Sequence, residues 1–315
     1  MIQPPKFRWT RESGQDLKVK DWIDTEVNNS EQWDATILGV PFARASISPS
    51  GASEFPDAFR RSWDFFSTYY IDEMVDFRGF KVGDLGDVML HATDVARSHA
   101  NIEEAMGQVL THYSGKLHTT IGGDHSITAP IVRAIAKHTG KKIGIIQFDT
   151  HLDMRDFSGG RTNGTPIRQL VEEGVVEGKN IVNIGLHGFY NAPSLIEAAK
   201  AHSIQMIMLN QLRKKGIEKI IDEAFQALSD VDLIYVTVDM DVLDVAYAPG
   251  VPSATPGGMR SDELFECLYE IGKHRIFAID FVCIDPLRDI VNQTIKATTY
   301  AYLTFIASTY WHHSN

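Results

Sequence analysis

Cysteine is scarce in this chain of 315 residues, which has only Cys267 and Cys283. Two cysteines cannot form the disulfide framework of small secreted domains, so we expect a protein of the reducing cytoplasm. Residues 1–10 also lack the basic and then apolar pattern of a secretory signal. No apolar run approaches the roughly 18 residues of a membrane span, and we therefore expect no membrane partner.

Basic residues are also in deficit, because 30 Lys and Arg face 41 Asp and Glu, for a formal net charge of −11. No basic stripe offsets this excess, which argues against a nucleic-acid partner. With 43% hydrophobic and 23% charged residues, the composition is that of a globular protein with a large core. The length fits either one large α/β domain or two smaller ones. Internal repeats and low-complexity tracts are lacking.

Short apolar runs alternate with longer helical patterns from Ala35 almost to the end of the chain. Most of these runs are continuous and rich in Val and Ile, which is typical of strands covered on both faces. The predicted strands are 35–40, 117–121, 143–148, 181–184, 205–209, 233–238 and 276–281, and the predicted helices include 127–138, 194–202, 217–228 and 262–272. This alternation predicts a parallel sheet with helices on both faces, whose ligand site lies beyond the carboxyl ends of the strands.

Metal-binding residue types follow the predicted strand at 143–148. Asp149, His151 and Asp153 occupy alternate positions, and alternate side chains of an extended segment share one face. Two carboxylates and an imidazole therefore converge at the end of a buried strand, where like charges repel each other and lose their hydration. A bound cation removes both costs, whereas the alternative interpretation is a solvated acidic loop.

Two further polar clusters also follow predicted strands. The segment 122–126, Gly-Gly-Asp-His-Ser, comes directly after strand 117–121. Its glycines permit a tight turn, although a glycine turn with a capping Asp or Ser is common at ordinary strand–helix junctions. Asp239 and Asp241 follow strand 233–238 and again share one face. Alone, such a pair either binds one Mg²⁺ or Ca²⁺ or caps a turn.

Together the three clusters place two imidazoles and four carboxylates at three strand ends, and these are His125, Asp149, His151, Asp153, Asp239 and Asp241. Six ligands exceed the needs of one catalytic ion that also keeps a water, and they suit a pair of ions with bridging carboxylates. Oxygen ligands with some imidazole favour Mn²⁺, with Zn²⁺ or Ni²⁺ as alternatives. Because such a pair activates water at neutral pH, the sequence predicts a hydrolase.

The three clusters, with the segments 238–244 and 248–258, resemble the signatures of the ureohydrolases, the group that contains arginase, agmatinase and formimidoylglutamase. The resemblance covers residues 35–305. It implies a three-layer αβα fold with a mostly parallel eight-stranded sheet, in one domain over 1–315 with 1–34 as an N-terminal extension. It also implies two Mn²⁺ per chain held by the same six residues, hydrolysis of a C–N bond at an amidine or guanidine carbon, and a homo-oligomer, either trimer or hexamer. Asp149 and Asp241 would be the bridging pair, and Asp153 would carry the proton.

The substrate prediction depends on Arg155, which stands where arginase has a neutral residue. The segments 163–168 and 178–182 are similar to formimidoylglutamases, whose substrate, N-formimino-L-glutamate, ends in two carboxylates that Arg binds bidentately. The cationic end of agmatine would be repelled by Arg155. Arg161 and Arg168 are weaker candidates for the same role, and an ion pair with Asp153 or Asp156 is the structural alternative for Arg155. His187 follows a strand end, where it either lines the pocket or caps a loop.

Two residues depart from the pattern of much of the family. Many members have a proton-shuttling His where Asn163 stands, and formimidoylglutamases often lack it. Arginases and agmatinases have a Glu that pairs with the guanidinium where Cys283 stands, and a thiol pairs that way only poorly. We therefore predict a formimidoylglutamase-like hydrolase that acts on a small molecule. The alternatives are an agmatinase or another guanidino-acid hydrolase that releases urea, a one-zinc deacylase, and a catalytically silent metal-binding subunit.

Overall fold

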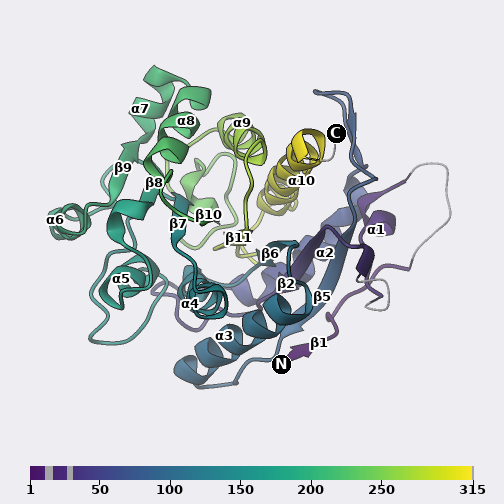
Figure 1. The fold of residues 1–315 in the computed structure, drawn as a ribbon, viewed down its shortest axis with the longest axis horizontal. Helices are drawn as coiled ribbons and strands as arrows, with labels where there is room; N and C mark the ends of the chain where they lie inside the picture. Colours follow the sequence, from purple (N-terminus) through teal and green to yellow (C-terminus); the bar gives the residue numbers. More distant parts are fainter. Residues whose placement is uncertain (11–16, 27–30, 314–315) are drawn as a thin grey trace.

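A nine-stranded sheet runs through the middle of the computed structural model, which describes residues 1–10, 17–26 and 31–313 (Figure 1). In spatial order its strands are β1 (Ile2–Gln3), β5 (Val82–Val88), β2 (Ala35–Gly39), β6 (Leu117–Ile121), β11 (Ala278–Val282), β10 (Leu233–Asp239), β7 (Ile143–Phe148), β8 (Ile181–Leu186) and β9 (Gln205–Met208). Among the residues that the structure describes, the edge pair β1–β5 is the one antiparallel pair of this sheet. The predicted mostly parallel sheet is confirmed, but it has nine strands rather than eight.

All seven strands predicted from apolar runs are present, two of them with the predicted bounds and the others with ends that differ by one or two residues. The prediction missed β5, a fully buried strand of the central sheet, because its sequence alternates glycine and aspartate with apolar residues. Its Asp84 and Asp87 are buried against Arg60 of α2 (Phe55–Ser62), which donates to Asp84 at 2.7 and 2.9 Å and to Asp87 at 2.7 Å. Strand β5 is therefore stabilised by a partner that lies elsewhere in the sequence.

Helices cover both faces of the sheet, and the two faces have separate cores. One face carries α3 (Val95–His112), α4 (Thr128–Thr139), α5 (Pro166–Glu172) and α6 (Pro193–Ala201), and the other carries α2, α7 (Leu209–Lys215), α8 (Ile217–Ala227), α9 (Ser261–Gly272) and α10 (Gln293–His313). Adjacent residues of β7 point into different cores: Ile145 packs in the core of the first face and Ile146 in the core of the second. Continuous apolar strands are required for this three-layer arrangement, as the sequence predicted.

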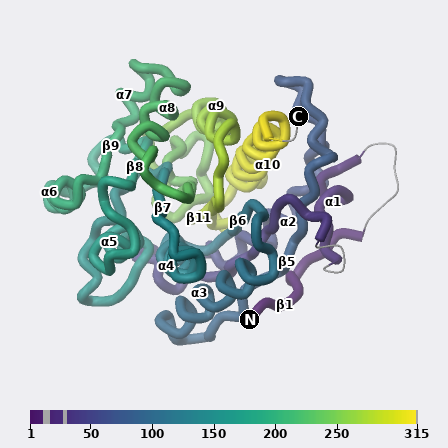
Figure 2. Tube along the Cα trace, in the orientation of Figure 1, coloured from purple at the N-terminus to yellow at the C-terminus, as the bar shows by residue number. Residues whose placement is uncertain are grey.

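The four named helix predictions are confirmed by α4, α6, α8 and α9, but the two longest helices, α3 and α10, were not among them. Helix α10 packs beside α9 and α2, as the yellow end of the trace shows (Figure 2). A short helix α1 (Val19–Trp22) and a hairpin of β3 (Tyr69–Tyr70) and β4 (Val75–Asp76) complete the main elements. Within the described residues, no helix combines the length and apolar character needed to traverse a bilayer.

Candidate metal centre

Four central strands end level with one another, and this brings the three polar clusters together. In the register of the sheet, Ile121 of β6 is opposite Phe281 of β11, which is opposite Val238 of β10, which is opposite Phe148 of β7. The segments that follow β6, β10 and β7 are the three predicted clusters. Because parallel strands all point the same way, these clusters meet at the carboxyl edge of the sheet.

The distances from the two histidine Nδ1 atoms to the surrounding carboxylate oxygens show how close the three clusters lie. Nδ1 of His125 lies 2.8 Å from Asp153 Oδ2 and 3.2 Å from one oxygen each of Asp149 and Asp239. Nδ1 of His151 lies 3.1 Å from Asp241 Oδ2 and 3.4 Å from Asp149 Oδ1. The structure therefore brings all six predicted ligand residues into one cluster, and five of them are buried while His151 is partly exposed.

Two sets of three residues in this cluster have the spacing of metal ligands. The first is His125, Asp149 and Asp153, and the second is Asp149, His151 and Asp241, with the ligand atoms of each set within 4.8 Å of one another. Asp149 belongs to both sets, which suits a carboxylate that bridges two ions. Asp239 joins the first set through its contact with His125.

A buried hydrogen-bond chain fixes the orientation and tautomer of His125. Asp280 accepts hydrogen bonds from the hydroxyls of Thr128 (2.7 Å), Tyr235 (2.6 Å) and Thr237 (2.5 Å). Because the Thr237 hydroxyl donates to Asp280, its oxygen accepts from Nε2–H of His125 at 2.9 Å. The other ring nitrogen, Nδ1, then presents its lone pair to three carboxylates.

This arrangement of lone pairs is the observation that tests whether a cation fits. Nδ1 of His125 and Oδ2 of Asp153 are buried and lack a hydrogen-bond partner, although they are 2.8 Å apart. Two acceptors at that distance repel each other unless a proton or a metal cation lies between them, and the neighbouring carboxylates accordingly raise the pKa of His125 against the opposing effect of burial. The donors are one imidazole with several carboxylates, which suits a divalent ion such as Mn²⁺. The residues therefore fit the predicted metals.

The pKa values of the cluster also reflect the repulsion among its buried carboxylates. Burial and the neighbouring carboxylates Asp241 and Asp149 raise the pKa of Asp239 to about 7. Burial and Asp149 likewise raise the pKa of Asp153 to about 6, although His125 opposes the shift. Burial would lower the pKa of His151, but Asp241 and Asp149 raise it to about 12. Without another cation, protons must therefore neutralise the cluster.

Backbone conformation also shapes the cluster. Gly122 and Gly123 both have positive φ, of 107° and 78°, and a Cβ on Gly123 would lie 2.9 Å from the carbonyl oxygen of Val40. The turn before His125 therefore requires glycine. Asp153 has a φ of 52°, a left-handed conformation that only glycine, asparagine and aspartate adopt readily. This turn directs the Asp153 carboxylate toward His125.

A cleft of about 100 Å³ opens onto the cluster. Its lining includes the four predicted ligand residues His151, Asp153, Asp239 and Asp241, together with the predicted Arg155 and Asn163. Sequence reasoning missed the remaining lining residues, which are Ile47, Ser48, Gly164, Tyr190, Leu195 and Ser253. Most of them come from loops without a periodic pattern, so no local signal identified them.

Arg155 is the arginine that reaches this cleft. Its side chain is exposed, and within the described ranges no ion pair joins it to Asp153, Asp156 or another carboxylate. Its stem lies over Gly164, where an added Cβ would come within 2.7 Å of Arg155 Cδ. The backbone N–H of Arg155 also donates to the Gly164 carbonyl at 3.0 Å. Gly164 therefore makes room for the arginine.

The other predicted substrate residues lie outside the lining of this cleft. Arg161 pairs with Glu173 at 2.6 Å, and Arg168 pairs with Glu172 at 2.7 Å. Cys283 is buried with a φ of 65°, and its thiol contacts Asp239 from beneath the cluster. Burial, with Asp239 and Asp241 nearby, raises the pKa of this thiol well above its ordinary value, so it is protonated at neutral pH.

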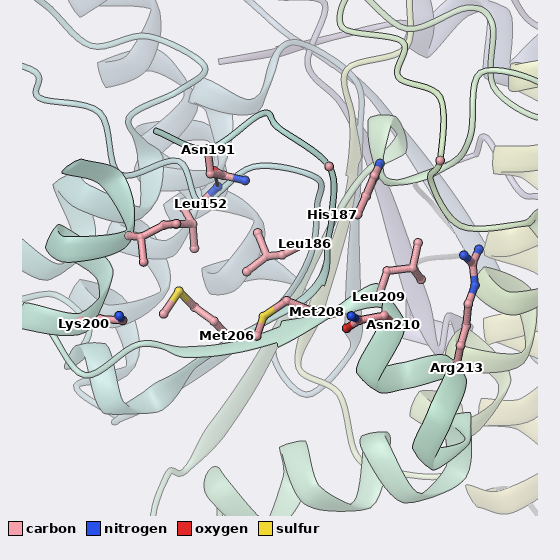
Figure 3. Close-up of a pocket in the computed structure, with 13 residues that line it drawn as sticks. Leu152, Leu186, His187, Asn191, Lys200, Met206, Met208, Leu209, Asn210 and Arg213 are labelled. Carbon is pink, nitrogen blue, oxygen red and sulfur yellow. Dashed lines mark hydrogen bonds between the residues drawn. The ribbon is translucent and has the colours of Figure 1, made fainter. Parts of the chain in front are cut away.

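His187 lines a neighbouring cavity of about 550 Å³ (Figure 3). Its Nδ1 bonds the Gly185 carbonyl at 2.8 Å and its Nε2 the Thr255 hydroxyl at 3.3 Å, as in a loop-capping role. Leu152 and Leu186 form part of the apolar wall of this cavity (Figure 3). Although this cavity is larger than the cleft at the cluster, none of the six predicted ligand residues lines it.

Comparison with known proteins identifies the family. The model of the arginase family matches residues 33–307, which is most of the chain. The chain belongs to the arginase family. It is 40% identical over 273 residues to the formimidoylglutamase of Halalkalibacterium halodurans, covering 86% of this chain and 85% of that one. It is 34% identical over 307 residues to the Bacillus subtilis formimidoylglutamase, covering 95% and 96%.

Solved structures of arginase-family proteins have the same fold. The crystal structure of the Bacillus subtilis formimidoylglutamase superposes with a TM-score of 0.89 at 33% identity, and the match covers 96% of each chain. The Trypanosoma cruzi formiminoglutamase with Mn²⁺ superposes with a TM-score of 0.85 at 26% identity, over 94% of this chain and 99% of that one. The arginase-like fold predicted from the sequence is thereby confirmed.

Proposed function

We propose that this arginase-family protein hydrolyses N-formimino-L-glutamate to L-glutamate and formamide. The formimidoylglutamases of Halalkalibacterium halodurans and Bacillus subtilis, at 40% and 34% identity, support this assignment. Two Mn²⁺ ions are the proposed cofactors, held by His125, Asp149, His151, Asp153, Asp239 and Asp241 as predicted, with Asp149 and Asp241 as the bridging pair. When bound, such a pair supplies an activated water at neutral pH and stabilises charge at the carbon under attack.

The observation that carries the substrate assignment is the unpaired Arg155 at the cleft. An arginine without a carboxylate partner beside a buried acidic cluster offers a bidentate site for the carboxylate of a ligand. The two carboxylates of N-formimino-L-glutamate satisfy this requirement. Agmatine ends in a cation instead, and Arg155 would repel it.

Asn163 positions the same ligand. Its Oδ1 accepts from the backbone N–H of Ile47 at 2.9 Å, and its own N–H donates to the Ala45 carbonyl at 2.9 Å. The side-chain oxygen is therefore occupied, and the amide –NH₂ donors remain for a ligand in the cleft. An amide cannot shuttle protons, so Asn163 acts by hydrogen bonding and by holding the Ile47 loop.

Asp153 carries the proton. Its carboxylate is buried, borders the cleft and contacts His125, so it can reach both the attacking water and the departing nitrogen. As the C–O bond forms at the formimino carbon, the water proton passes to Asp153. As the C–N bond breaks, Asp153 returns this proton to the nitrogen of glutamate, and the carbon leaves as formamide.

A guanidino-acid hydrolase is the second candidate, because the chain is also 30% identical to the guanidinopropionase of Pseudomonas aeruginosa. A guanidino acid likewise has a carboxylate for Arg155. Cys283 argues against this candidate, because its buried neutral thiol does not line the cleft and cannot pair with a guanidinium as glutamate does. A silent metal-binding subunit is disfavoured because the whole ligand set is retained.

The test is a substrate panel of formiminoglutamate, guanidinopropionate, guanidinobutyrate, arginine and agmatine with the Mn²⁺-loaded protein. Turnover of formiminoglutamate alone is the expected result, and turnover only of a guanidine would contradict the assignment. Arg155→Ala should raise KM by about 10- to 100-fold, since hydrogen bonds to charged groups contribute about 1.5–3 kcal/mol, and should leave the metal content unchanged. Arg78→Ala, which removes an exposed arginine paired with Asp76, is the matched control.

We also propose a cytoplasmic homo-oligomer, a trimer or hexamer, in keeping with the family resemblance. Sedimentation of the metal-loaded protein would test the assembly state. A monomer at assay concentrations would contradict it.

A further inference from the structure

Tyr190 lines the cleft at the candidate metal cluster, and no step of the proposed reaction uses it. Its side chain is half-buried. In the described part of the chain its hydroxyl has no hydrogen-bond partner, and it is not among the polar atoms closed off from solvent. The hydroxyl therefore offers the cleft a donor that the protein itself leaves unused.

The loop that carries Tyr190 is fastened to the segment of the candidate metal ligands. Asn191 accepts from the backbone N–H of Leu152 at 2.9 Å and donates to the carbonyl of Thr150 at 2.8 Å, and Figure 3 shows Asn191 beside Leu152. It thus bonds to both chain neighbours of His151. The Tyr190 ring meets the His151 ring edge-on, with 6.3 Å between the ring centroids. Tyr190 therefore has a fixed place beside a candidate metal ligand.

Two further contacts orient the tyrosine ring. The ring of His187 meets it edge-on, with 5.7 Å between the centroids. The ring also lies against Gly188, where an added Cβ would come within 2.6 Å of Tyr190 Cε2. Gly188 makes room for the tyrosine as Gly164 does for Arg155. The cleft therefore has two side chains with unused donors, and each lies over a glycine.

The two side chains suit different parts of one ligand. Tyr190 is half-buried against the ring of His151, whereas Arg155 is exposed. In N-formimino-L-glutamate, the α-carboxylate is attached to the carbon that bears the reacting nitrogen, and the other carboxylate is at the end of the side chain. When the formimino carbon is at the metals, the α-carboxylate is the nearer one. It therefore suits Tyr190, and the distant carboxylate suits Arg155.

We propose that Tyr190 determines specificity by donating its hydroxyl proton in a hydrogen bond to the α-carboxylate of the substrate, while Arg155 binds the side-chain carboxylate. This inference rests on the proposed function and deepens it. A guanidino acid has a single carboxylate and leaves one of the two donors unused. The pair therefore accounts for a preference for dicarboxylates that the metal cluster alone cannot provide.

Two truncated substrates test this inference with the Mn²⁺-loaded protein. N-formimino-4-aminobutyrate lacks the α-carboxylate, and N-formimino-L-norvaline has a methyl group in place of the side-chain carboxylate. Tyr190→Phe should lower kcat/KM about tenfold or more on N-formimino-L-glutamate and on the norvaline derivative, and should leave it unchanged on the 4-aminobutyrate derivative. Arg155→Ala should lower it on N-formimino-L-glutamate and on the 4-aminobutyrate derivative only.

Tyr69→Phe, at an exposed tyrosine of the β3–β4 hairpin, is the matched control and should behave as the wild type on all three substrates. An equal loss in Tyr190→Phe on N-formimino-L-glutamate and on the 4-aminobutyrate derivative would overturn the proposal, because a disturbed fold or metal site affects every substrate alike. Unchanged activity of this variant on N-formimino-L-glutamate would overturn it as well.

Failure of the proposed function gives a different result, namely a wild-type protein that turns over none of the three substrates. Calorimetric titration with L-glutamate, which has both carboxylates, then tests Tyr190 separately. Weaker binding of L-glutamate to Tyr190→Phe than to the wild type supports the inference. Equal affinity, or no binding to the wild type, overturns it.

Discussion

The sharpest prediction concerns Thr237, whose hydroxyl links Asp280 to His125 of the candidate metal cluster by two hydrogen bonds. Valine has nearly the same shape as threonine but neither donates nor accepts. In Thr237→Val, the buried Nε2–H of His125 loses its acceptor and Asp280 loses one of three hydroxyl donors. The ring can then rotate or change tautomer, and Nδ1 no longer holds its lone pair toward the carboxylates.

The expected loss of metal affinity follows from the function of such supporting hydrogen bonds. Removing the partner of a metal-ligating histidine typically weakens binding about 10- to 100-fold. This range corresponds to about 1.4–2.7 kcal/mol. Competition with a chelating dye for Mn²⁺ measures the affinity, and urea unfolding of the metal-free protein measures stability separately.

Thr36→Val is the matched control. Thr36 is buried and bonds Nδ1 of buried His118 at 3.0 Å, so the same substitution again removes a threonine–histidine hydrogen bond. This pair lies near the amino-terminal ends of β2 and β6, away from the metal cluster. We expect both variants to lose stability, and only Thr237→Val to lose metal affinity. A Mn²⁺ affinity within about threefold of wild type in Thr237→Val would refute the reasoning.

Three further predictions concern buried charge. Arg60→Met should lower the free energy of unfolding in urea by about 3–5 kcal/mol, because it leaves two buried carboxylates of β5 unpaired. The control, Arg61→Met, removes an exposed ion pair and should lower the free energy of unfolding by less than about 1 kcal/mol. Chelation of the metals should lower the melting temperature. Asp239→Asn should recover part of that loss in the metal-free protein, because it removes one of the carboxylates that repel each other in the cluster. If the metal-free variant melts below the metal-free wild type, the explanation by carboxylate repulsion is wrong. Burial lowers the pKa of His118 from 6.5 to about 4, so the unfolded chain binds a proton at this residue that the folded chain does not, and the contribution of His118 to stability falls as pH drops below 6.5. At pH 5 the loss should be about 2 kcal/mol relative to pH 7, and a His118→Gln variant with the same pH dependence as wild type would disprove it.

The cluster of candidate metal ligands could be predicted from the sequence because its pattern is local. Asp149, His151 and Asp153 follow a continuous apolar strand at alternate positions, and the same rule found Asp239 and Asp241. The strands themselves were predicted for the same reason. Strand β5 was missed because its aspartates are neutralised by Arg60, whose position relative to β5 depends on the tertiary fold.

The substrate side of the site was harder to predict. Three arginines, Arg155, Arg161 and Arg168, were candidates in the sequence, and the structure brings only Arg155 to the cleft. The i,i+4 pair of Arg168 with Glu172 could have been found in the sequence as a helix-surface pair. The contact of Arg161 with Glu173 could not, because Arg161 lies in the irregular segment before α5 and Glu173 at the far end of that helix, so no helical spacing relates them.

At position 153, the residue that would best stabilise the left-handed backbone differs from the residue that the proposed proton transfer requires. Glycine there would adopt the same φ of 52° without steric cost, and it would also remove a repelling carboxylate from the metal-free cluster. A laboratory selection for heat resistance in metal-poor conditions should therefore drift toward glycine at position 153. Such a selection would enrich stable proteins that have lost the proposed proton carrier, so thermal tolerance in this protein is a poor guide to retained activity.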